Sequence, residues 1–205
     1  MQMKSIGVFC CAAMLVVNLP ELSSVQSHAT AHSKQTCLEW ETLVRENRAL
    51  ESDAAAQVKT DAIRELGKLK CASSIDILVS EIEFMRPDTE EEKAGAFFSP
   101  RGFSHMYPAI LALASVGKQA GPALVSFLAN PETSQIARRN AEYALMEAYR
   151  YDRPAAISLL VRSAGGRTNL SSSVLMTTAT DALRWCTPPE RKSCEAALKA
   201  AQEEK

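Results

Sequence analysis

The chain has little of what a metal site or a catalytic centre needs. It contains three histidines, and only one of them, His105, lies in the body of the chain, where we expect a structural role. No Cys-x-x-Cys pair occurs, so the usual spacing of zinc ligands is missing. The Gly-x-Ser-x-Gly elbow of hydrolases, the Gly-rich phosphate loop and the His-Glu-x-x-His pair of metalloproteases are missing as well. The sequence therefore indicates no catalytic residues, no metal and no cofactor.

Neither strong charge nor strand-like alternation is found along the chain. The formal net charge is −1, with 23 Lys and Arg against 24 Asp and Glu. A near-neutral chain lacks the positive surface by which proteins bind nucleic acid or anionic membranes, so we expect neither as a partner. After the N-terminal region, no stretch alternates apolar and polar residues over the length of a strand. With the helical patterns described below, this predicts an all-α fold.

The N-terminal residues have the pattern of a secretory signal peptide. Lys4 precedes an apolar run over residues 5–19, and small residues follow at Ala29 and Ala31. This order of a positive start, an apolar stretch and small residues favours cleavage after one of the two alanines. We therefore expect a secreted or periplasmic protein.

Two other interpretations of the same residues are an uncleaved membrane anchor and a lipoprotein. The apolar run is short for a span of about 20 residues. The residues before Cys10 lack the Leu-small-small-Cys pattern of a lipoprotein. We expect residues 1–31 to be a signal peptide with a disordered start. Residues 32–205 then form one domain, the default at this length, without a stable membrane span.

A passage of the chain repeats itself. Residues 109–128 align without a gap with residues 141–160, and in each copy two leucines lie fifteen residues apart. The same distance separates Leu183 from Leu198, and residues 62–82 match the first half of the unit before the pattern slips by one position. Self-similarity at a period of a few tens of residues is typical of stacked-repeat architectures.

Each unit is predicted to contain two helices. In residues 109–128 the apolar positions follow helical spacing, and the pattern is interrupted at Gly117 and Gly121. Pro122 then suits the first turn of a second helix, where its missing N–H breaks no helical bond. Pro154 stands at the same place in the next unit.

The four units predict four antiparallel helix pairs in one right-handed stack over residues 54–202. Before them, residues 37–50 carry a helical apolar stripe, which we expect to cover the exposed side of the first unit. Residues 86–105 form an insertion between the first two units, and residues 165–173 are expected to be a loose linker.

The Ala-x-x-Ala-Leu helix, the short turn with Gly or Asp, and the proline-started second helix with its Leu-Leu end are similar to HEAT or HEAT-like (armadillo-type) repeats. The clearest stretches are residues 107–128 and 136–161, and the likeness covers residues 54–202 apart from the insertion. It implies a short α-solenoid of about four helical hairpins with an N-terminal capping helix.

Families of this type mostly serve as protein-binding scaffolds. The resemblance therefore implies an exported scaffold that is not an enzyme and that binds a protein or peptide partner through its groove. One branch resembles the repeats of phycobilin lyases, which handle tetrapyrroles, and export argues against that activity here. The alternatives are a lyase-like or accessory enzyme that uses the groove as a small-molecule site, and a structural spacer in an envelope assembly.

Aromatic residues beside arginine mark two candidate binding regions. Three of the six phenylalanines lie in the insertion, and residues of the third repeat unit are rich in Arg and Tyr. Aromatic and Arg side chains dominate protein-binding hot spots. The alternatives are that the phenylalanines pack the insertion onto the helices and that the third unit simply has a solvated face. The candidate binding residues are Phe97, Phe98, Arg101, Phe103, Tyr151 and Arg162.

Four cysteines remain once the signal peptide is removed, and they allow three pairings. When the last unit is aligned with the earlier ones, Cys186 lies near the end of the unit's first helix. Cys194 lies near the start of its second helix, and a proline-containing turn separates the two. Antiparallel helices bring these two places together. Cys37, at the start of the capping helix, then pairs with Cys71 in the turn of the first unit. Four free thiols are the alternative.

The repeat also predicts which side chains are buried. Leu113 and Leu145 occupy the same apolar position in two units, so we expect both in the core. Glu142 is expected on the surface.

Overall fold

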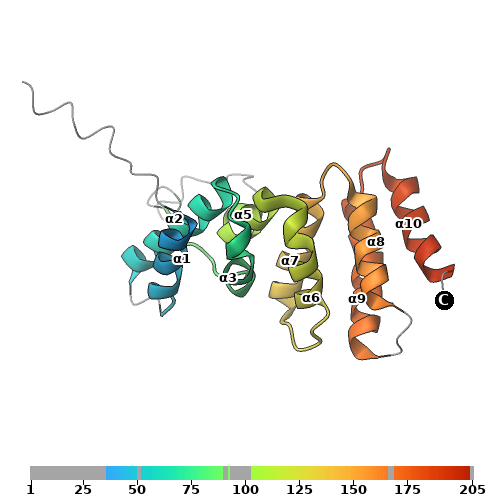
Figure 1. The fold of residues 1–205 in the computed structure, drawn as a ribbon, viewed down its shortest axis with the longest axis horizontal. Coiled ribbons are helices and arrows are strands. Elements are labelled where there is room, and N and C mark those ends of the chain that lie inside the picture. Colours follow the sequence, from blue (N-terminus) through green and yellow to red (C-terminus); the bar gives the residue numbers. More distant parts are fainter. Residues whose placement is uncertain (1–35, 50–51, 90–91, 93–102, 166–168, 204–205) are drawn as a thin grey trace, which may run out of the picture. The chain divides into compact units, whose positions relative to one another are not determined.

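Helices make up most of the described part of the chain, which comprises residues 36–49, 52–89, 92, 103–165 and 169–203 of this computed structural model (Figure 1). No strand occurs among these residues, so the all-α prediction is confirmed. The α-helices are α1 (Cys37–Glu46), α2 (Asp53–Lys68), α3 (Ile75–Ser80), α5 (Pro108–Val116), α6 (Gly121–Leu128), α7 (Gln135–Ala148), α8 (Arg153–Ala164), α9 (Leu170–Ala182) and α10 (Arg191–Glu203). Short 3-10 helices lie between them: η1 (Ala72–Ser74), η2 (Phe103–His105), η3 (Gly117–Ala120) and η4 (Leu183–Trp185).

Local capping chemistry explains where the helices begin. Thr36 and Glu39 form a capping box at α1, in which each side chain accepts a hydrogen bond from the backbone N–H of the other residue. Ser52, Ser134 and Asn169 accept backbone N–H bonds at the starts of α2, α7 and α9. Proline stands in the first turn of α5, α6 and α8. Pro122 and Pro154 thus lie in the first turn of the second helices of the two clear repeat units, as predicted.

Residues 35–205 form one compact unit. Within residues 35–205, α2 contacts α5, α5 contacts α7, and α7 contacts α9. The helices α3, α6, α8 and α10 contact one another in the same order. The two sets meet where α3 packs on α5, α6 on α7, and α8 on α9. Figure 1 shows the labelled helices succeeding one another from α1 to α10.

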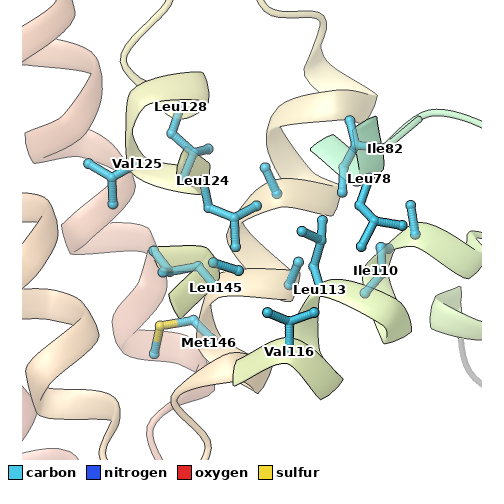
Figure 2. Packing of buried hydrophobic residues seen from close by; sticks show 14 of the residues in the cluster. Leu78, Ile82, Ile110, Leu113, Val116, Leu124, Val125, Leu128, Leu145 and Met146 are labelled. Carbon is cyan, nitrogen blue, oxygen red and sulfur yellow. The ribbon is translucent and has the colours of Figure 1, made fainter. Parts of the chain in front are cut away.

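Leucines of the repeat fill the space between these helices (Figure 2). Leu113 of α5, Leu124 of α6 and Leu145 of α7 are fully buried. The burial predicted for Leu113 and Leu145 is thus confirmed. Small residues allow close packing elsewhere, since a Cβ added to Gly67 of α2 would lie 2.6 Å from the Cα of Ala112 in α5. No side chain fits there, so the approach of α2 to α5 depends on glycine.

The two glycines of the second unit differ in role. Gly117 follows the last residue of α5 with a φ of 81°, a left-handed conformation that glycine adopts without strain. Gly121 was also expected to interrupt the helical pattern, but it is the first residue of α6. A Cβ at Gly121 would lie 2.6 Å from the hydroxyl oxygen of Tyr149, so glycine is needed there for space.

Two disulfides lie near the two ends of the helical unit. Cys37, the first residue of α1, is bonded to Cys71 just before η1, with Cα atoms 5.8 Å apart. Cys186, which follows η4, is bonded to Cys194 in α10, with Cα atoms 6.7 Å apart. These are the two pairs that the repeat frame favours. Because α1 also packs on α2, the first disulfide ties α1 to the first helix pair.

The slip of the repeat pattern at Glu81 has a structural cause. Glu81 occupies the expected leucine position and is buried, with Ile82 taking the apolar contact beside it. The carboxylate of Glu81 pairs with the buried ammonium of Lys59 at 2.5 Å and with Arg48 at 3.4 Å. The Lys59 Nζ also lies 4.5 Å from the centre of the Phe84 ring. A buried ion pair therefore joins α2 to the end of α3.

Arg86 holds together the two ends of the insertion. Its backbone N–H donates to the Met106 carbonyl at 2.9 Å, and its guanidinium donates to the His105 carbonyl and to both carboxylate oxygens of Glu92. The Thr89 hydroxyl accepts a hydrogen bond from the Glu92 N–H. The hydrogen bonds from Arg86 and Thr89 lower the pKa of Glu92 to about 2. Arg86 thus ties the start of the insertion to Glu92 and to the residues at its end.

One described segment, Pro108–Leu128, is long and apolar enough to cross a membrane by length and composition alone. It comprises α5, η3 and α6, and these helices pack against α2, α3 and α7. Here it is a core element of residues 35–205.

The linker predicted over residues 165–173 is shorter than expected, because residues 170–173 are the first turn of α9. The Asn169 side chain accepts a hydrogen bond from the Ser172 N–H and so begins the helix before the three serines. The Ser172 hydroxyl in turn donates to the Ala164 carbonyl, which ties the start of α9 to the end of α8.

Candidate functional site

A pocket of about 460 Å³ lies beside α7, where the end of α9 and η4 face it. Two sets of residues at helical spacing line it, at positions i, i+3, i+4 and i+7 of α7 and at positions i, i+3 and i+4 across the α9–η4 junction. All lining residues are polar, charged or aromatic: Gln135, Arg138, Arg139, Glu142, Asp181, Arg184 and Trp185.

Glu142 is the most buried of these side chains, with 5% of its surface exposed. Its carboxylate accepts two hydrogen bonds from Arg184 Nη2, each 3.0 Å, and one of 2.7 Å from Trp185 Nε1. The expectation that Glu142 lies on the surface was wrong. The alignment of the repeat units does not distinguish one outward-facing position from another. The position of Glu142 is covered by α9 and η4.

Burial controls the protonation of Glu142. Loss of water around the carboxylate raises its pKa, and the nearby negative charge of Asp181 acts in the same direction. The hydrogen bond from Trp185 and the charge of Arg184 oppose the rise without cancelling it. The pocket therefore contains a carboxylate that binds a proton more readily than an exposed glutamate does.

An aromatic pair supports one side of the pocket. The rings of Tyr143 and Trp185 meet edge to face, with centroids 5.0 Å apart. The Arg184 guanidinium lies 5.2 Å from the Trp185 ring, in the range of a cation–π contact. Because Trp185 is held by both a ring contact and a hydrogen bond, its orientation is fixed before any ligand arrives.

The arginines on α7 have different surroundings. Arg138 is partly buried, and its Nη2 lies within hydrogen-bonding distance of the carbonyls of Asn130, Pro131 and Thr133, which fixes the turn before α7. Carbonyl groups do not neutralise its charge. Arg139 is exposed at the next position of the helix. The pocket thus has two positive side chains on its α7 side in addition to Arg184.

The structure describes the side chains of two of the predicted binding residues, Tyr151 and Arg162, and places both outside this pocket. Phe97, Phe98 and Arg101 lie outside the described residues, as does the side chain of Phe103, whose backbone begins η2. Tyr151 is 85% exposed just after α7, with the guanidinium of Arg150 4.6 Å from its ring. Arg162 is exposed on α8. Neither Tyr151 nor Arg162 lines the pocket.

The arginines of the Arg- and Tyr-rich third unit have different roles. Arg138 and Arg139 line the pocket. Arg153 is instead structural, since its guanidinium pairs with Glu147 at 3.4 Å and with Glu190 at 3.0 Å. Composition alone did not distinguish these roles.

Sequence reasoning missed the side of the pocket formed by Asp181, Arg184 and Trp185, together with Gln135 and Glu142. The signal that was present is spacing. Three charged residues and a glutamine recur on one face of α7, beside the alanine and leucine face that builds the core. A polar stripe that continues for two turns next to a core face indicates contact with another element.

Among the described residues, no group of three or more His, Cys, Asp or Glu side chains is arranged to hold a metal ion. Comparison of the chain with protein-family models, with curated proteins and with solved structures found no match.

Proposed function

We propose that the protein is an exported α-solenoid of the HEAT-like kind and that it binds a protein or peptide partner at the pocket between α7 and η4. The observation that carries this proposal is the pocket itself, which is lined by three arginines and by a tryptophan whose orientation is already fixed. Trp and Arg are the side chains most enriched in binding hot spots. A preorganised site also loses little conformational freedom on binding.

The order of helix contacts supports the solenoid part of the proposal. Contacts run from each helix pair to the next along the chain, as expected when each repeat stacks on its neighbour. The exposed positions of α9 outside the pocket include Ser173, Thr177 and Thr180. A polar outer face on the last helix pair suits a terminal repeat, which must be soluble.

Export is supported by two features. Residues 4–31 have the order of a signal peptide, and this segment lies outside the described residues. The two disulfides accord with an oxidising compartment. We propose a secreted or periplasmic location, which N-terminal sequencing of the exported protein tests through cleavage after Ala29 or Ala31.

A binding role fits the pocket better than catalysis does. Glu142, whose pKa is raised, would be the natural proton acceptor, but hydrogen bonds from Arg184 and Trp185 already occupy its carboxylate. A general base must reach the proton that it removes. The volume of about 460 Å³ also suits a small molecule, so a lyase-like or accessory activity is the competing outcome of the test below.

Photo-crosslinking in the native exporting cell tests the proposal. The crosslinking residue p-benzoyl-phenylalanine replaces Gln135 at the pocket, or Asp76 on the exposed side of α3 as a control. Mass spectrometry of the adduct identifies the partner and the segment that touches the pocket. We expect one specific polypeptide adduct from the Gln135 position and none from the Asp76 position.

Adducts of equal yield from both positions, or none from either, would contradict a binding site at this pocket. An adduct of small-molecule mass from the Gln135 position would favour the lyase-like alternative instead.

A further inference from the structure

The pocket residues of η4 are followed by a short exposed turn. On its N-terminal side η4 continues α9, whose last residue, Ala182, is buried. On its C-terminal side the chain leaves the helices at Thr187, Pro188 and Pro189, and all three are exposed. Proline has no backbone N–H, so the two prolines cannot donate hydrogen bonds that would hold this turn to a neighbouring helix. The position of Trp185 therefore depends on ties elsewhere on this side of η4.

The disulfide of Cys186 and Cys194 provides the tie nearest to Trp185 in the chain. Cys186 directly follows Trp185, and the two bonded side chains are 8% and 0% exposed. Two polar ties support the same region. Arg191 Nη1 donates to the Leu183 carbonyl at 2.8 Å, but the Arg191 side chain is 46% exposed. Glu190 pairs with Arg153 at 3.0 Å, at the far end of the exposed turn.

The last helix depends on the same disulfide. α10 contacts α8 and η4. Among residues 191–200, Cys194 has the only buried side chain, and Ala197 and Leu198 are half-buried against the core. A helix at the end of a stack has a neighbour on one side only, and such ends open most easily. Without its disulfide, α10 would be weakly held to α8 and would no longer support η4.

Resting on the proposed function, we infer that the disulfide of Cys186 and Cys194 is the positioning element of the pocket, which forms only after these thiols are oxidised. In this step the two sulfur atoms become bonded and the thiols lose two electrons and two protons, while a disulfide oxidant of the export compartment is reduced to two thiols. Trp185 then takes the orientation in which its Nε1 reaches Glu142. The reduced chain does not bind the partner before export.

The other disulfide, between Cys37 and Cys71, is a matched control. It ties α1 to the first helix pair, and neither of its cysteines lines the pocket. Two variants each lose one disulfide by replacement of both cysteines with alanine. The C-terminal variant lacks Cys186 and Cys194, and the N-terminal variant lacks Cys37 and Cys71.

Tryptophan fluorescence reports on the pocket without a partner. The chain has two tryptophans, so Trp40→Phe leaves Trp185 as the only one. In this background we expect the C-terminal variant to emit at longer wavelength and to be quenched by acrylamide at least about twofold more strongly, because Trp185 becomes open to solvent. The N-terminal variant should match its parent. Far-UV circular dichroism should show that both variants keep their helices, apart from α10 in the C-terminal variant.

Reduction tests the oxidation step itself. The N-terminal variant retains only the disulfide of Cys186 and Cys194, so dithiothreitol reduces no other bond among the described cysteines. Alkylation and mass spectrometry measure the reduced fraction of these two cysteines. We expect the Trp185 emission to change in proportion to that fraction and to return on reoxidation with oxidised glutathione.

Crosslinking connects the disulfide to binding. With p-benzoyl-phenylalanine at Gln135, the C-terminal variant should give at least about tenfold less adduct than the native protein, because few molecules have a competent pocket. The N-terminal variant should give the native yield. Native yields from both variants would overturn the requirement for oxidation.

Unchanged Trp185 emission and quenching in the C-terminal variant, or an equal change in both variants, would overturn the inference. Loss of the whole helical signal from the C-terminal variant would overturn it as well, because the disulfide would then hold the entire fold and not the pocket in particular. A failure of the proposed function is distinguishable, since the fluorescence test needs no partner. No specific adduct from Gln135 in the native protein contradicts the binding site and leaves the positioning of Trp185 to be decided by fluorescence.

Discussion

Glu142 connects the stability of the fold to the pocket. Its pKa is raised by burial, so the folded state favours the protonated form. A raised carboxyl pKa gives a contribution to stability that is fully present below the unfolded value of 4.5 and is lost as the pH rises through the folded pKa. Glu142→Gln removes this titration. We therefore expect the native protein to lose stability relative to Glu142→Gln as the pH rises from 4.5 to 7. The measured quantity is the difference between their free energies of unfolding.

Glu142→Ala is the matched comparison. It removes the acceptor of Trp185 Nε1 and Arg184 Nη2, and hydrogen bonds to a charged group are typically worth about 1.5–3 kcal/mol. Gln keeps an oxygen that accepts from Trp185. Urea unfolding at several pH values measures both effects, and parallel pH profiles for the native protein and Glu142→Gln would show that Glu142 titrates normally.

The buried ion pair of Lys59 and Glu81 allows a second prediction about stability at the residue scale. Both side chains are buried, so Lys59→Ala leaves a carboxylate in the core with only Arg48 as a partner. Breaking a buried pair from one side typically costs about 3–5 kcal/mol. Replacing both residues, as Lys59→Met with Glu81→Leu, should recover most of that loss. A double variant as unstable as Lys59→Ala would rule out the pairing as the cause.

The repeated leucines provide a test of the core. Leu113→Ala and Leu145→Ala should each destabilise the fold by about 2–5 kcal/mol, because both side chains are fully buried. Gln119→Ala in η3 is an appropriate exposed control and should stay within about 0.5 kcal/mol. Thermal unfolding compares the three, and similar melting temperatures would mean that the two leucines are not in the core.

At the scale of elements, the insertion is expected to be dispensable for folding. Its two ends meet at Arg86, whose hydrogen bonds reach Met106 and His105. Replacing residues 93–102 by a short Gly-Ser linker, which keeps Arg86 and Glu92, should therefore leave the melting temperature within a few degrees of the native value. A large loss of stability would show that the insertion packs on the helices, which is the alternative role considered for its phenylalanines.

The same loop base has a defined pH dependence. The pKa of Glu92 is held at about 2 by Arg86 and Thr89, below its ordinary value of 4.5. A lowered carboxyl pKa gives a contribution that is present above 4.5 and is lost as the pH falls through about 2. The contact of Arg86 with Glu92 should therefore persist at mildly acidic pH.

Non-reducing peptide mapping of protein purified from an oxidising compartment tests the disulfides. We expect Cys37 linked to Cys71, which closes a separation of 34 residues, and Cys186 linked to Cys194 across a separation of 8. In the chain-entropy treatment the longer loop contributes more, nearly 4 kcal/mol against about 2.5 kcal/mol for the shorter one. A bond between Cys37 and either C-terminal cysteine, or four alkylatable thiols, would contradict this pairing.

The sequence predicts helices and core better than it predicts the pocket, for a physical reason. Helix starts depend on nearby residues such as Pro122, Pro154 and Asn169, and the repeated leucines mark the core directly. Burial of Glu142 depends instead on a partner 42 residues away, Arg184. Nothing local to Glu142 distinguishes it from a surface glutamate.

At the scale of the whole molecule, helices in the described part of residues 35–205 contact mainly their neighbours along the chain. In such an arrangement a site can form between successive helix pairs without a cavity in the core. The pocket has this character, since its residues come from α7 and from the α9–η4 junction. The central claim is that the partner binds there.

Hydrogen–deuterium exchange of the disulfide-bonded protein, alone and in complex with the partner identified by crosslinking, tests that claim most directly. Backbone amides report which segments the partner covers or stabilises. We predict slower exchange in the complex for residues 135–142 and 181–185, with residues 53–80 unchanged. Protection confined to residues 86–106, with the pocket segments exchanging as in the free protein, would contradict the claim and make the insertion the binding element.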